Sequence, residues 1–147
     1  MKTIEKYRLA SITEEFLSKL VDDFTIMEHE LFTTFDSEDA KFIKTYIMIE
    51  NILEDSRSYA KGRRINNHFL KDFSVVQEKI THTEMMLQFY KSGLISGLDR
   101  IALEYFVKSC LLPSLENLMV IYGAKGYCNN YPPTQLWLEV RKLFYFC

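Results

Sequence analysis

The longest regular pattern of apolar positions in the chain runs from Ile65 to Leu94. Its members are separated by three, four or seven residues, at Ile65, Phe69, Phe73, Val76, Ile80, Leu87, Tyr90 and Leu94. This spacing places side chains along one side of an α-helix. We therefore predict a long amphipathic helix over about Asn66–Ser92, which Gly93 ends.

Similar patterns predict two helices before this one. Ser11 and Glu14 have the spacing of a capping box at the start of a helix over about Ile12–Phe35. Ser37 is the expected N-cap of a second helix, which runs to about Ala60. The expected buried stripes are Ile12, Phe16, Leu20, Phe24, Met27 and Leu31 in the first helix, and Phe42, Ile43, Tyr46, Ile49, Ile52 and Leu53 in the second.

The C-terminal third of the chain predicts two more helices. The linker Gly93–Gly97 is short, so the next helix, over about Leu98–Tyr122, should return antiparallel, with Ser96 or Asp99 as its cap. Pro113 lies inside this helix and predicts a kink or break near Ser109–Leu112. A last helix covers about Thr134–Phe144. The predicted fold is all-α, a largely antiparallel bundle of about five main helices in one domain, residues 1–147.

The composition agrees with a helical domain and excludes several other classes. The 147 residues include only 5 Gly and 3 Pro, which favours a few long helices over many short strands. The net charge of −2 gives no strong overall attraction for nucleic acid or membranes. No apolar run reaches the ~18 residues of a membrane span. Cys110, Cys128 and Cys147 form no paired motif, and no leader is recognised, so we expect a reducing, cytoplasmic location.

Charge is nevertheless distributed unevenly along the chain. The segment Glu14–Asp39 holds nine acidic residues and one basic residue, Lys19, whereas Arg57–Lys71 holds five basic residues and no acidic one. Two solvated helix faces explain this distribution most simply. The alternative is a basic binding site for phosphate or an acidic partner, made by Arg57, Lys61, Arg63, Arg64 and Lys71.

The segment Glu84–Ser96, with the sequence EMMLQFYKSGLIS, resembles a segment of a large group of bacterial helical proteins of unassigned activity. In that group a helical glutamate precedes a glycine by nine residues, and an apolar pair and an Asp or Ser follow. The resemblance covers about Phe42–Leu143 and implies a helical bundle. It implies no activity, and members of the group often begin with a membrane helix that this chain does not show.

Arg63 and His68 have the Arg-x4-His spacing that resembles the motif of helical ribonucleases of the HEPN class. In that class a dimer brings two such pairs to an RNA phosphate, where a histidine moves a proton and an arginine holds the phosphate. The resemblance therefore implies a ribonuclease or RNA-binding function. Arg64 departs from the class, which usually has a small polar residue after the arginine. A solvated basic turn is the alternative.

The sequence offers few other candidates for chemistry. None of the three His residues has a Glu three positions before it, so we expect no carboxylate-bridged metal site, and we expect no cofactor. Serine-hydrolase and phosphate-loop motifs are not found. Trp137, Arg141 and Phe144 belong to an aromatic C-terminal cluster that either docks on the core or forms an interface.

The best functional hypothesis is a small cytoplasmic protein-interaction protein of the adaptor or inhibitor type. We expect a protein partner, with a homodimer as an alternative, and we do not expect an enzyme. The expected surfaces are the acidic face of the first helix, the basic segment Arg57–Lys71 and the aromatic C-terminus. The second hypothesis is the ribonuclease-like or RNA-binding protein that uses Arg63 and His68. A partner in a viral or mobile-element system is a third, by association alone.

Overall fold

The computed structural model describes residues 13–22 and 37–145. In these residues five helices pack with each other, so the predicted all-α bundle is confirmed. The elements are α2 (Glu14–Asp22), α4 (Ser37–Gly62), β1 (Arg64–Ile65), β2 (His68–Phe69), the 3-10 turn η1 (Leu70–Asp72), α5 (Ser74–Ser96), α6 (Arg100–Phe106), the π-helix η2 (Val107–Leu111), α7 (Leu112–Met119), the 3-10 segment η3 (Val120–Tyr127) and α8 (Pro132–Tyr145).

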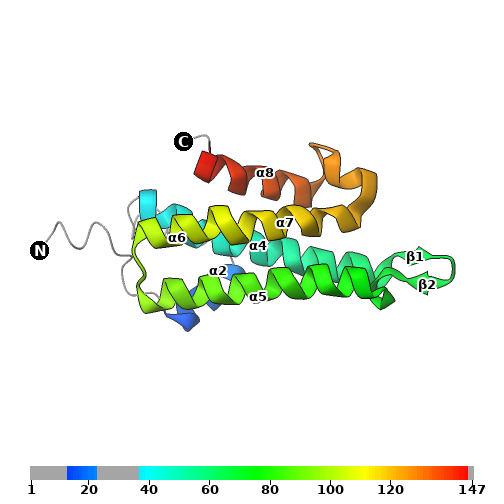
Figure 1. Ribbon diagram of the computed structural model, residues 1–147, viewed down its shortest axis with the longest axis horizontal. Coiled ribbons are helices and arrows are strands. Elements are labelled where there is room, and N and C mark those ends of the chain that lie inside the picture. The colour runs from blue at the N-terminus through cyan, green and yellow to red at the C-terminus, as the bar shows by residue number, and fades with distance from the viewer. Residues whose placement is uncertain (1–12, 23–36, 146–147) are drawn as a thin grey trace, which may run out of the picture.

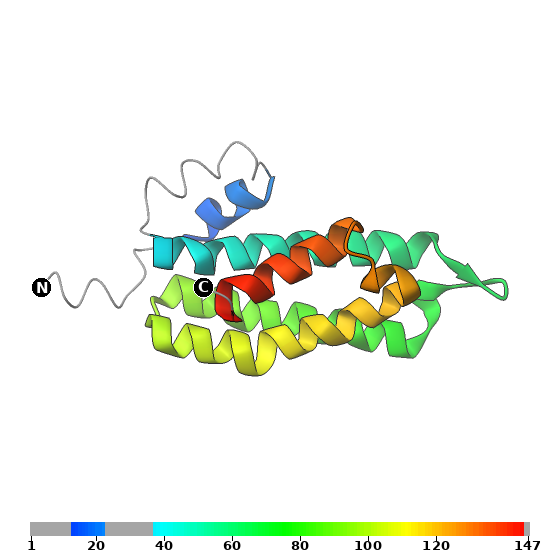
Figure 2. The same ribbon diagram turned by 90° about the horizontal axis from the view of Figure 1, so that it is seen from above.

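Three long rods form the body of the bundle. Figure 1 shows α4 running behind α5, and α6, η2 and α7 forming one rod that returns beside α5. The short hairpin of β1 and β2 projects from one end. Figure 2 shows α8 lying across the rods formed by α4 and α7, with α2 on the outer side of α4. The connections are short, and consecutive rods are antiparallel, as predicted.

Helix α4 is the centre of the core. All six residues of its predicted stripe are buried, and so are Ile47 and Met48 on its other sides. Because α2, α5 and α8 all pack on α4, nearly its whole circumference is removed from water between Asp39 and Leu53, whereas its last turns keep an exposed side. Thr45 and Ser56 are buried with it, and each hydroxyl donates to a backbone carbonyl one turn earlier, at 2.7 and 2.8 Å. These polar groups are therefore satisfied within the helix.

The predicted start of the long helix is wrong. Residues 64–69 form an antiparallel hairpin in which Arg64 pairs with Phe69 and Ile65 with His68, and α5 begins only at Ser74. The turn residues Asn66 and Asn67 have positive φ angles of 51° and 69°, which asparagine tolerates better than most residues. Ile65 is consequently 43% exposed and does not join the core.

The predicted end of that helix is also wrong, by one turn. Helix α5 continues through Gly93 to Ser96, and Gly97 provides the left-handed residue that stops it, with φ 77° and ψ 37°. The Gly97 and Leu98 N–H groups bond back to the carbonyls of Leu94 and Gly93. Gly93 has a different role, because the turn after α5 and α6 both lie so close that a Cβ there would be 2.9 Å from Leu98 Cδ1 and 3.2 Å from Leu103 Cδ2.

The predicted irregularity at Pro113 is confirmed. The helix widens to a π-helix over Val107–Leu111, in which the Leu112 N–H bonds to the carbonyl of Val107. Pro113 has no N–H to continue the regular pattern and crowds the carbonyl four residues earlier, which favours such a bulge. On the other side of the bulge, Asp99 begins α6 as predicted, with its carboxylate accepting from the Ala102 N–H at 2.8 Å.

The two ends of the described chain pack on the central helix. In α2 the Thr13 hydroxyl caps the helix by accepting from Phe16 N at 3.1 Å, and Leu17 is buried. Ser11 and most of the predicted first helix lie outside the described residues. Helix α8 begins at Pro132, two residues before the predicted start, and buries Val140 and Phe144.

Candidate binding surfaces

The predicted basic residues gather at one end of the bundle. Arg57 and Lys61 lie in the last turns of α4, and Lys71 lies in η1, where the chain returns from the hairpin. All three line a hollow of about 180 Å³, whose other walls include Ala60 and Ile80. The structure therefore brings together three of the five basic residues that were predicted to bind a ligand, around a partly apolar floor.

Arg64 and Lys71 meet on the ring of Phe69. The Arg64 guanidinium carbon lies 4.6 Å from the ring centre, and the Lys71 ammonium lies 5.8 Å from it. Cations at this range are attracted by the face of an aromatic ring. The sequence analysis had placed Phe69 in a helical core stripe, but its position opposite Arg64 in the hairpin makes it a half-buried support for these cations.

Arg63 and His68 lie on the other face of the hairpin. The Leu70 N–H donates to the Arg63 carbonyl at 2.8 Å, so Arg63 and Leu70 form the next pair of the hairpin after Arg64 and Phe69. Because side chains alternate between the two faces along each strand, Arg63, Ile65 and His68 point to the same side. Both predicted ribonuclease residues are exposed. Arg63 lines a hollow of about 330 Å³ with Tyr59 and Lys125. The His68 ring instead lies nearly perpendicular to the Phe73 ring, with the two ring centres 6.3 Å apart.

Most of the positive charge at this end is not neutralised. Arg57 is paired, because its Nε lies 2.8 Å from Glu84 Oε1, which ties α4 to α5. Within residues 13–22 and 37–145, Lys61, Arg63, Arg64 and Lys71 make no ion pair. The nearest acidic residue in the sequence is Asp72, beside Lys71. This end of the molecule is therefore locally basic although the whole chain is slightly acidic.

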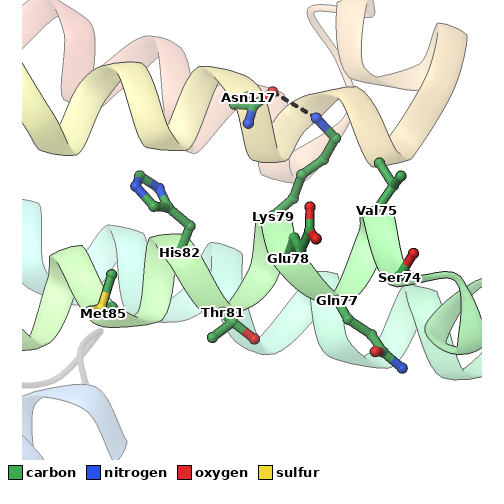
Figure 3. A pocket seen from close by; sticks show the side chains of 9 residues that line it. All are labelled: Ser74, Val75, Gln77, Glu78, Lys79, Thr81, His82, Met85 and Asn117. Atoms are coloured by element: carbon green, nitrogen blue, oxygen red, sulfur yellow. Dashed lines mark hydrogen bonds between the residues drawn. The ribbon is translucent and has the colours of Figure 1, made fainter.

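A groove that the sequence analysis missed runs between α5 and α7. It has a volume of about 710 Å³ and is lined by Ser74, Val75, Gln77, Glu78, Lys79, Thr81, His82, Met85 and Asn117. Figure 3 shows the side chains of Val75, Lys79 and His82 directed from α5 toward α7, with Lys79 Nζ bonded to Asn117 Oδ1 at 2.7 Å. The sequence signal was a set of apolar residues on α5 outside the core stripe, namely Val75, Met85 and Phe89.

Polar contacts at the base of the groove hold the two helices together. His82 Nδ1 lies 2.8 Å from Ser114 Oγ, which is also 3.0 Å from Thr83 Oγ1. Ser114 is only 4% exposed, and no carboxylate orients His82 in the described part of the chain. This geometry stabilises the contact between α5 and α7, and it does not present a serine nucleophile to a substrate.

The structure places the residues of the predicted C-terminal interface in two different environments. Phe144 is buried, with its ring 5.6 Å from that of Phe42, as expected for the alternative in which the C-terminal cluster docks on the core. The reason is that α8 turns this side toward α4. Trp137 and Arg141 remain near the surface, where the guanidinium lies 5.4 Å from the Trp137 ring and both line a hollow of about 130 Å³.

The predicted acidic surface is described only at its ends. Glu14 bonds to Lys91 at 2.9 Å, and Asp39 is buried against Arg100 at 2.8 Å. Cys110 is partly buried, and Cys128 is exposed. No three metal-ligating side chains gather in the described ranges, and none of the helices there is long and apolar enough to cross a membrane.

Comparison with known proteins provides no further assignment. No protein-family model matches the chain. No curated protein and no solved structure matches it either. The resemblances to the bacterial helical group and to the ribonuclease class therefore remain expectations from short motifs, and the arguments for function depend on the surfaces described above.

Proposed function

We propose that the chain acts by binding, and that it holds an amphipathic helix of a partner protein in the groove between α5 and α7. The observation that carries this proposal is the exposure of large apolar side chains along the α5 side of the groove. Val75 is 59% exposed and Met85 47%, and Phe89, which lies on α5 one turn beyond the residues that line the groove, is 57% exposed. Such residues gathered on one helix side are typical of an interaction surface.

The shape of the groove favours a helix as the occupant. It follows α5, which supplies all its lining residues except Asn117 of α7, and Val75 and Met85 lie almost three turns apart along it. A partner helix could contact these positions with apolar residues three, four and seven apart. Full burial of each such side chain contributes roughly 1.5–3 kcal/mol. Other polar residues that line the groove, including Gln77 and Glu78, would orient the partner.

Site-specific photo-crosslinking tests the proposal in the native cytoplasm. A photoreactive residue at Met85 is expected to give a discrete adduct with one other protein. The same residue at Tyr127, which is 76% exposed on η3, is the matched control and should not give that adduct. An adduct between two copies of the chain would overturn the separate partner in favour of a homodimer. Equal adducts from both positions would contradict a specific groove.

A substitution experiment measures the contribution of the apolar side chains. The double variant Met85→Gln, Phe89→Gln keeps residues that suit an exposed helix, and it should lower capture of the crosslinked partner at least tenfold because the apolar anchors are lost. Tyr127→Gln should leave capture unchanged. Thermal unfolding of both variants checks that the bundle is intact. Undiminished capture by the double variant would exclude the groove as the binding site.

The ribonuclease-like function is the second candidate, because Arg63 and His68 lie on the same exposed face of the hairpin. It predicts RNA cleavage by the purified protein that falls at least tenfold in both Arg63→Ala and His68→Ala. Intact RNA after incubation with the wild-type protein, or cleavage by both variants at the wild-type rate, would remove this candidate.

A further inference from the structure

The face of the hairpin opposite Arg63 and His68 combines uncompensated cations with an aromatic ring. Arg64 and Lys71 lie over Phe69, and Lys61 lies beside Lys71 around the hollow of about 180 Å³. Phe69 holds the guanidinium in place before any ligand arrives, so less side-chain entropy is lost when Arg64 binds an anion. We call Lys61, Arg64, Phe69 and Lys71 the basic hairpin face.

We propose that the basic hairpin face binds single-stranded nucleic acid, with its cations on the phosphates and a base against the apolar floor or the stacked guanidinium. A single strand alternates phosphates with flat, partly apolar bases, and proteins bind it with cations and stacking surfaces side by side. The basic hairpin face likewise places cations next to apolar and flat surfaces. Cations surround a hollow floored by Ala60 and Ile80, and a guanidinium lies on a ring.

The shape of the molecule makes this face accessible. Figure 1 shows the hairpin extending beyond the ends of the helices. Lys61, Arg64 and Lys71 are all exposed. A peptide of acidic residues alone would satisfy the cations but offers no flat ring for the hollow or for Arg64. The observations therefore favour a nucleic acid, and a peptide becomes an outcome of the test.

Fluorescence anisotropy with a labelled 12-nucleotide uridine RNA tests the proposal on the full chain. The wild-type affinity should fall steeply with salt, because each phosphate contact releases counterions. Arg64→Gln, Lys71→Gln should weaken binding at least tenfold at low salt. Lys19→Gln, Lys108→Gln removes the same charge from α2 and η2 and should change affinity less than twofold. Phe69→Leu, which keeps an apolar residue but removes the ring, should weaken binding severalfold.

Several results would overturn the proposal. These are no binding at low salt, an equal loss in the charge-matched control, and equal or tighter binding of a labelled polyglutamate or of duplex RNA.

Retained affinity in His68→Ala is expected, because that residue lies on the other face. In the wild-type protein, bound RNA should also protect Lys61 and Lys71 from acetylation more than Lys19. This second readout does not depend on the folding of any variant. Failure of either test would not count against the proposal that the groove between α5 and α7 binds a helix.

Discussion

At the scale of single residues, the buried tyrosine hydroxyls determine how precisely the helices are joined. Tyr90 is 1% exposed, and its hydroxyl donates to the backbone carbonyl of Phe42 at 2.6 Å, which links α5 to α4. Tyr122 makes a similar link, with its hydroxyl 2.7 Å from Asp55 Oδ2 and 2.9 Å from Ser56 Oγ. Each phenol therefore contributes both ring burial and a satisfied polar contact between helices.

Removing one of these hydroxyls should have a measurable cost. Tyr90→Phe keeps the ring and loses the bond to Phe42, so the free energy of unfolding should fall by about 1 kcal/mol. Tyr105→Phe is the control, because Tyr105 is 73% exposed and should change stability by less than about 0.5 kcal/mol. Urea denaturation measures both. Equal stabilities of the two variants would contradict the role of the Tyr90 hydroxyl.

At the scale of elements, turn geometry explains where the sequence interpretation failed. Ile65, Phe69 and Phe73 continue the helical spacing of α5, yet the first two lie in the hairpin and Phe73 precedes the helix. The spacing of apolar residues does not report φ, whereas Asn66 and Asn67 both adopt positive φ and reverse the chain. Adjacent asparagines were the available signal. The hairpin in turn separates Arg64 from Arg63, onto opposite faces.

The end of α5 allows a direct test of such backbone requirements. Gly97→Ala places a Cβ on a residue with φ 77°, and it should lower the free energy of unfolding by about 1 kcal/mol. Gly62→Ala, at the end of α4 with no atom near the added carbon, is the control and should be close to neutral. Thermal unfolding compares the two. A neutral Gly97→Ala variant would show that the turn can relax at no cost.

At the scale of the whole molecule, the core contains several phenols whose ionisation is disfavoured by burial. Burial raises the pKa of Tyr46, Tyr90 and Tyr122 above the ordinary value of 10.0. In the unfolded chain these groups lose their protons above about pH 10, whereas in the folded chain they keep them. Stability is therefore unaffected by them below pH 10 and decreases as the pH rises through and above that value.

The alkaline behaviour of the protein provides the measurement. Tm should fall between pH 9 and 11, together with a delayed rise of tyrosinate absorbance that coincides with unfolding. Tyr90→Phe should show a shallower fall, because one buried phenol is missing. Absorbance that rises fully near pH 10 while the helical circular dichroism persists would contradict the burial of these hydroxyls.

Much of the architecture could be predicted from local patterns. The stripe of α4, the irregularity at Pro113, the cap at Asp99 and the approximate bounds of α8 all follow from spacing, the missing proline N–H and side-chain capping, which act within a few residues. The basic character of residues 57–71 is likewise a property of composition. Such local signals are enough to specify that the chain is helical and the class of its fold, but they misplaced both ends of α5.

The surfaces required the tertiary structure, because they combine residues that only packing brings together. Lys71 reaches Arg57 and Lys61 through the return of the hairpin, and Asn117 reaches Lys79 through the pairing of α7 with α5. Phe144 is removed from the surface because α8 rotates it toward Phe42. Apolar spacing specifies one buried side for each helix, but which remaining side meets a neighbour and which meets water depends on how the rods cross.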